Sequence, residues 1–183
     1  MNTSENIKFQ PSTPPSGRFD ASTGGLQFPA DTLELVHKII KRYPEGKQKS
    51  AILPILHLAQ AEWRWISPEV MDYVAGILSI KPIEVYEVAT FYTMFHLEPV
   101  GNHVIEYCRT GPCCVMGGVD VYNHIQNKLG IKTGETTPDG KFTLKQVECL
   151  AACGWGPVFA IREKFYMNLT NEKVDEIIEE LSK

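Results

Sequence analysis

Four of the five cysteines stand in two short pairs, Cys108-x4-Cys113 and Cys149-x3-Cys153. A [2Fe-2S] cluster needs four thiolates, because each tetrahedral iron takes two cysteine sulfurs besides the two bridging sulfides. The spacing therefore predicts one [2Fe-2S] cluster with Cys108, Cys113, Cys149 and Cys153 as its ligands.

The adjacent Cys113 and Cys114 leave a choice of ligand, because neighbouring residues point in different directions and one iron uses only one of them. We take Cys113 as the ligand. Cys114 is then expected to be a small buried thiol against the same loop, since free cysteine is among the most buried residue types. Cys114 stays open as the alternative ligand.

Other chemistries fit the sequence less well. Zinc also takes four thiolates but usually prefers Cys-x2-Cys pairs, and a dithiol catalyst needs the same closer spacing. Gly154-Trp155-Gly156 lacks the third glycine of a dinucleotide fingerprint and precedes a strand rather than a helix. The five histidines are scattered without metal-ligand spacing, which disfavours a Rieske-type centre.

The elements around the cysteines predict how the two pairs meet. Alternation predicts strands over 103–107 and 142–147, each running directly into a cysteine pair. Between them, Gly117 and Gly118 precede a helix that ends at Gly130. Further strands over 157–161 and 165–169 and a last helix capped by Thr170 complete a compact thioredoxin-like α/β unit. Both pairs would lie at one sheet edge, with Cys113 just before a helix N-terminus that favours negative charge.

The segment before this unit is helical. Helices are expected over 33–43 and 50–65, and after the helix-opening Pro68 and Pro82. Together they predict a small bundle. Its expected core includes the aromatic side chains of Trp63, Trp65, Tyr86, Phe91 and Phe95. The predicted organisation is a disordered tail over 1–28, a helical domain over 29–98 and the α/β domain over 99–183.

The composition limits which classes of partner and which cellular compartment are expected. The formal net charge is −4, with no basic stripe for a phosphate backbone, so nucleic acid is not an expected partner. No apolar stretch reaches the roughly 18 residues of a membrane span, and no signal peptide is apparent. An odd cysteine count without a secretory signal argues for metal or redox chemistry in the cytoplasm.

Three segments carry a family resemblance: Leu53 to Gln60, Val85 to Phe95, and Val147 to Gly154 continuing through Pro157. Over residues 29 to 182 the chain resembles the thioredoxin-like [2Fe-2S] ferredoxin subunit of NADH:quinone oxidoreductase, respiratory complex I. The family's cysteine pattern, with a proline before the second ligand as in Pro112-Cys113, falls on Cys108, Cys113, Cys149 and Cys153. The family often has an aromatic residue where this chain has Cys114.

The resemblance implies an electron-transfer subunit within an NADH dehydrogenase, holding one [2Fe-2S] cluster near the flavin of a partner. That partner, the flavin-bearing subunit, would carry FMN and oxidise NADH, so this chain would have no hydride-transfer site of its own. It would lie with other subunits of the peripheral arm, on the cytoplasmic inner face of the cell membrane. Equivalent subunits serve NAD-linked hydrogenases and formate dehydrogenases. Alternatives of another class are a zinc-stabilised adaptor and a dithiol oxidoreductase.

Overall fold

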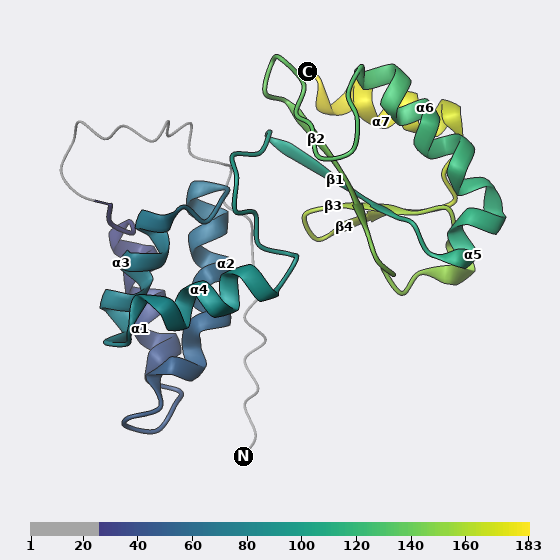
Figure 1. Ribbon diagram of the computed structural model, residues 1–183. Coiled ribbons are helices and arrows are strands. Elements are labelled where there is room, and N and C mark those ends of the chain that lie inside the picture. The colour runs from purple at the N-terminus through teal and green to yellow at the C-terminus, as the bar shows by residue number, and fades with distance from the viewer. Residues whose placement is uncertain (1–25) are drawn as a thin grey trace. The chain divides into compact units, whose positions relative to one another are not determined.

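The computed structural model describes residues 26–183, which divide into two compact units at Pro99 and Val100 (Figure 1). Most of the predicted tail, residues 1–25, lies outside the described residues. Across the described chain, no helix is both long and apolar enough to pass through a bilayer.

The first unit contains four α-helices, and local capping explains where they begin. The helices are α1 (Ala30–Ile40), α2 (Ile52–Trp63), α3 (Pro68–Leu78) and α4 (Pro82–Phe91), with a 3-10 turn at Gln48–Ala51 before α2. Ser67 caps α3, because its hydroxyl accepts a hydrogen bond from the Val70 N–H at 3.3 Å. At α4, Glu84 accepts from the Lys81 N–H at 3.0 Å. The predicted helical bundle is confirmed.

The core of this unit differs from the predicted one near the beginning and the end of the helical segment. Phe28 is 4% exposed and stacks on Trp63 at 4.7 Å between ring centroids, so the packed core already includes a residue placed in the tail. Phe91 is 75% exposed, and its assignment to the core was wrong. Val85 and Ala89 are the buried positions of α4, and Phe91 lies about 200° around the helix from Ala89.

The second unit is a four-stranded sheet in the order β2-β1-β3-β4. The central strand β1 (His103–Cys108) runs parallel to β2 (Phe142–Val147) and antiparallel to β3 (Phe159–Ile161), which pairs antiparallel with β4 (Lys164–Tyr166). The first two strands are as predicted, β3 is shorter than expected, and β4 ends at Tyr166, so residues 167–169 are not strand. The mixed sheet and its helices confirm the thioredoxin-like α/β class.

Two helices, α6 (Val119–Leu129) and α7 (Asn171–Leu181), pack against each other beside the sheet (Figure 1). Apolar residues of the two helices share one core with residues of the strands. The helices contribute Val121, Ile125, Val174 and Ile178, and the strands contribute Ile105, Tyr107, Leu144 and Phe159. Gly130 ends α6 in the left-handed conformation, and Thr170 caps α7 through the Lys173 N–H, as predicted.

Polar contacts between α6 and α7 predict a pH-dependent contribution to stability. Asp175 accepts from His124 at 2.9 Å and pairs with Lys128 at 3.3 Å, and Lys128 also lies 3.7 Å from Glu179. The His124 hydrogen bond is the main cause that lowers the pKa of Asp175, burial opposes it, and Lys128 lowers the pKa further. A lowered carboxyl pKa stabilises the fold above the unfolded-state value of about 3.9, and this contribution falls as the pH drops further.

We therefore expect Asp175→Asn to reduce the hydrogen-exchange protection of α6 and α7 amides more at pH 7 than at pH 3. Protection factors for this unit alone, compared with the wild type at each pH, provide the measurement. An equal loss at both pH values would show that the ionised carboxylate is not the stabilising group.

Candidate metal centre

The parallel pairing of β1 and β2 brings the two cysteine pairs to one edge of the sheet. Cys108 is the last residue of β1 and lies opposite Val147, the last residue of β2. The ladder continues for one more bond, because the Arg109 N–H donates to the Val147 carbonyl at 3.1 Å. The segments that lead to Cys113 and Cys149 therefore leave the sheet side by side.

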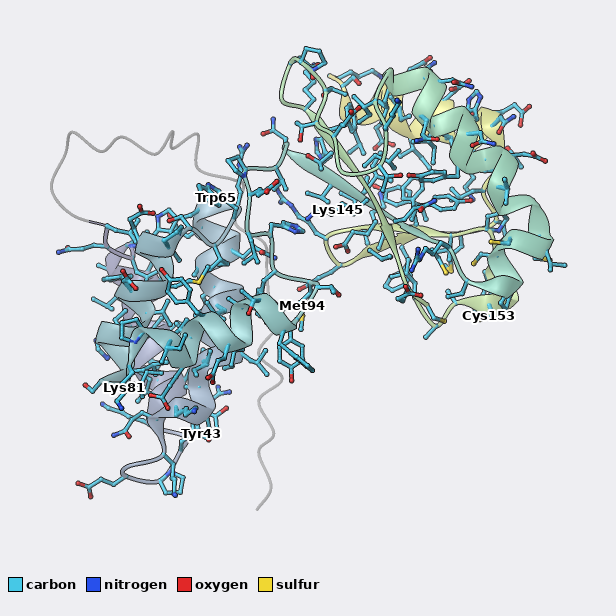
Figure 2. The ribbon with its side chains drawn as sticks, viewed as in Figure 1. Tyr43, Trp65, Lys81, Met94, Lys145 and Cys153 are labelled. Atoms are coloured by element: carbon cyan, nitrogen blue, oxygen red, sulfur yellow. The ribbon has the colours of Figure 1, made fainter. Side chains whose placement is uncertain are left out.

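The thiols influence each other within each pair. Cys108 acts to raise the pKa of the Cys113 thiol, and Cys149 acts to raise that of Cys153. The two pairs lie within electrostatic range of each other, since Cys153 acts to raise the pKa of Cys113 and Cys108 acts to raise that of Cys153. Figure 2 shows Cys153 at the end of the unit where α5 (Gly111–Cys113) lies in Figure 1.

Burial differs between the two pairs. Cys108 and Cys113 are 2% and 1% exposed, whereas Cys149 and Cys153 are exposed. Burial, together with the neighbouring Cys108, raises the pKa of the Cys113 thiol to about 11. Burial also acts to raise the pKa of Cys108, but hydrogen bonds from Thr110, Leu150 and Cys113 outweigh it and leave that pKa below its usual value.

Hydrogen-bond donors surround the sulfurs. The Ala151 N–H donates to the Cys149 Sγ at 3.2 Å, and the Thr110 hydroxyl lies 3.2 Å from the Cys108 Sγ. Backbone groups of Leu150 and Val158 bond to Cys108 and Cys113 respectively. These donors favour thiolates, because a hydrogen bond to the charged form stabilises it. Sequence reasoning identified neither Thr110 nor Ala151 as a donor.

The segment after Cys113 is helical but irregular. Helix α5 continues through a π-helical segment, η2 (Cys114–Gly118), into α6, so Cys113 lies inside the first turn rather than before it. Gly117 has φ +88°, a left-handed conformation that glycine adopts without strain. Gly118 approaches the backbone of Cys113 so closely that a Cβ there would lie 2.5 Å from the Cys113 carbonyl oxygen.

Cys114 is not the buried thiol that the sequence predicted. It is exposed, and its thiol donates to the Arg109 carbonyl at 3.4 Å. It lines a cavity of about 220 Å³ with Arg109, Asn123 and Gln146. One residue further along the helical turn than Cys113, Cys114 is rotated by about 100°, which takes it out of the buried face.

Four cysteine sulfurs on two loops, with several donors to them, match in number and type the ligands that a [2Fe-2S] cluster needs. The match lies in this chemistry and in the shared sheet edge. Within residues 26–183, no group of three or more histidine, cysteine, aspartate or glutamate side chains is arranged to hold a metal ion.

Comparison with known proteins agrees with this chemistry. A family model described as thioredoxin-like [2Fe-2S] ferredoxin matches residues 36–182. An NADH-quinone oxidoreductase subunit of Rickettsia conorii is 45% identical over 155 residues, covering 84% of this chain and 93% of that protein. The mitochondrial NADH dehydrogenase [ubiquinone] flavoprotein 2 of Dictyostelium discoideum is 41% identical over 157 residues, covering 85% of this chain and 64% of that protein.

A solved structure supports the fold. An NAD⁺-reducing [NiFe]-hydrogenase chain in the air-oxidized state superposes with a TM-score of 0.65 at 20% identity, covering 72% of this chain and 23% of that one. The relatives found by sequence are named as parts of oxidoreductases, and each covers more than four fifths of this chain. The chain belongs to the thioredoxin-like [2Fe-2S] ferredoxin family and, within it, to the members that are subunits of NADH-quinone oxidoreductases.

Proposed function

We propose that this chain is an electron-transfer subunit that holds one [2Fe-2S] cluster through Cys108, Cys113, Cys149 and Cys153. The observation that supports the proposal is that the two cysteine segments leave the sheet at the same edge, where β1 and β2 end, with the pairs within electrostatic range of each other. Two thiols on each loop match two irons, each of which needs two cysteine sulfurs. When bound, the cluster would accept and release one electron.

The protein's own groups favour a negatively charged centre. Four thiolates with two ferric ions and two sulfides carry a charge of about −2, which becomes about −3 on reduction. Backbone N–H groups that donate to Cys108, Cys113 and Cys149 compensate part of this charge. Buried Cys108 and Cys113 would hold one iron away from water, and the exposed Cys149 and Cys153 would hold the other close to the surface.

The host complex is proposed from the relatives. Identity of 45% over most of the chain favours a respiratory NADH-quinone oxidoreductase over a hydrogenase, for which the likeness is 20%. An equivalent place in an NAD-linked hydrogenase or a formate dehydrogenase is the alternative. In the respiratory host, a flavin-bearing subunit would oxidise NADH and exchange single electrons with this centre.

Exposed apolar residues beside the cysteines support a partner over this edge. Val115, Met116, Val119 and Trp155 are each more than half exposed. A Cβ at Gly156 would lie 3.5 Å from the Cys113 Sγ and 3.6 Å from the Met116 Cγ, so the Met116 side chain lies close to the Cys113 sulfur. Exposed apolar side chains gathered near a site are typical of interaction surfaces, and a covering subunit would also shield Cys149 and Cys153 from solvent.

Anaerobic reconstitution with ferrous iron and sulfide tests the proposal. We expect about two irons and two acid-labile sulfides per chain, visible charge-transfer absorption, and an electron paramagnetic resonance signal after one-electron reduction. A parallel experiment supplies zinc in place of iron and sulfide. Tight binding of one zinc without any assembly of iron and sulfide would instead support the zinc-stabilised adaptor, and reduction of disulfides by metal-free protein would support a dithiol enzyme.

A further inference from the structure

Thr110 occupies a helix-capping position without acting as a cap. It precedes α5 in the extended conformation usual for an N-cap, with φ −81° and ψ 161°, yet its side chain makes no capping hydrogen bond. A threonine at this position normally accepts from the second or third N–H of the helix. The second residue of α5 is Pro112, which has no N–H, and the N–H of the third residue, Cys113, is not bonded by the Thr110 side chain. The Thr110 hydroxyl is therefore available to another partner.

That partner is the sulfur of Cys108. The hydroxyl oxygen lies 3.2 Å from the Cys108 Sγ, and the sulfur also receives bonds from the backbone of Thr110 and of Leu150. With a thiol, either atom could donate. A thiolate can only accept, so the hydroxyl must donate its proton to an ionised Cys108.

We propose that Thr110 is a positioning residue that raises the reduction potential of the centre by donating this hydrogen bond to Cys108. The inference rests on the proposed function, and it adds a control over potential to that function. Gain of one electron takes the ligated centre from about −2 to about −3, with no bond formed or broken and no proton taken up at Thr110. A donor to sulfur stabilises the more negative state more strongly, so it favours reduction.

Burial makes this contact more effective than one at the surface would be. Cys108 is 2% exposed, so little water is present to replace a missing donor. The backbone donors from Thr110 and Leu150 are fixed by the chain, whereas the hydroxyl can be removed by substitution. Thr110→Val keeps the shape of the side chain and removes the donor, and Thr110→Ser keeps the donor and removes the methyl group.

Redox titration of the reconstituted full chain, followed by electron paramagnetic resonance with dithionite as reductant, tests the inference. We expect Thr110→Val to lower the equilibrium constant for reduction about tenfold, which corresponds to 59 mV for one electron, and Thr110→Ser to stay near the wild type. Pulsed electron paramagnetic resonance should detect a coupled proton that is replaced by deuterium in D₂O. We expect this signal in the wild type and in Thr110→Ser, and its absence in Thr110→Val.

Equal potentials in the wild type and Thr110→Val would overturn the inference, as would an equal decrease in Thr110→Ser. If Thr110→Val fails to hold the cluster, Thr110→Ala provides the same comparison with a smaller side chain, and the proton coupling of the wild type still tests the donor. Failure of the wild type itself to assemble a cluster would instead refute the proposed function.

Discussion

Replacing Cys113 by serine is expected to abolish or strongly reduce the visible absorption of the reconstituted chain. Cys113 is 1% exposed and Cys108 is 2% exposed, so the substitution removes a sulfur from the buried pair. Loss of a group that only supports a ligand typically lowers metal affinity about 10- to 100-fold, and loss of a ligand should lower it further. Iron and acid-labile sulfide per chain, measured after desalting, give the result.

Cys114→Ser is the matched control, because it makes the same chemical change one residue away. The Cys114 thiol is exposed and donates to the Arg109 carbonyl, an interaction that a serine hydroxyl can replace. We expect this variant to retain its iron and its spectrum. Retention in Cys113→Ser together with loss in Cys114→Ser would reverse the choice of ligand between the two neighbours.

Much of this fold could be predicted from the sequence because local chemistry and periodicity agree. Ser67 before Pro68, Thr170 before the last helix and Gly130 after α6 mark helix ends, and the structure has each of them in that role. Alternation over 103–107 and 142–147 predicted the strands that bring the cysteines together.

The misplaced residues share a physical cause. Phe91 and Cys114 are apolar or weakly polar side chains in segments with apolar residues on several faces, so composition did not reveal which face is buried. Exposure of such residues is also common at surfaces that meet a partner. Phe28 is the opposite case, because it is buried through stacking on Trp63, which is distant in sequence.

The hydrogen bonds to sulfur were beyond sequence reasoning for another reason. Which amide faces a sulfur depends on backbone angles, as at Ala151, whose φ of 57° accompanies its bond to Cys149. A threonine between two cysteines suggests a donor only when its capping role is known to be unfilled, and that depends on the local helix geometry.

Gly118→Ala is expected to destabilise the α/β unit and to lower its cluster occupancy. Gly118 has helical angles, φ −61° and ψ −27°, so helix propensity alone would predict that alanine stabilises by about 1 kcal/mol. The opposing effect is steric. A Cβ would lie 2.5 Å from the Cys113 carbonyl oxygen, 2.9 Å from its carbon and 3.2 Å from the Tyr107 hydroxyl.

The steric effect should prevail because the nearest atoms belong to the backbone and cannot rotate away. Overpacking typically costs about 1–3 kcal/mol. Relief requires a shift of Cys113 or a break in the 2.7 Å bond from the Tyr107 hydroxyl to the Gly118 carbonyl, and a shift of Cys113 moves a proposed ligand. Hydrogen exchange of β1 and α6 amides measures the stability of this unit, and iron per chain measures occupancy.

Gly111→Ala is the control within the same segment. Gly111 is the first residue of α5, and a Cβ there would meet nothing within 4 Å. We expect unchanged occupancy and unchanged or slightly higher protection in this variant. If Gly118→Ala also kept its iron and its protection, the close approach of Gly118 to Cys113 would not be a constraint on the centre. If instead both alanine variants lost iron, flexibility of the whole segment from 111 to 118 would be the property that cluster binding requires.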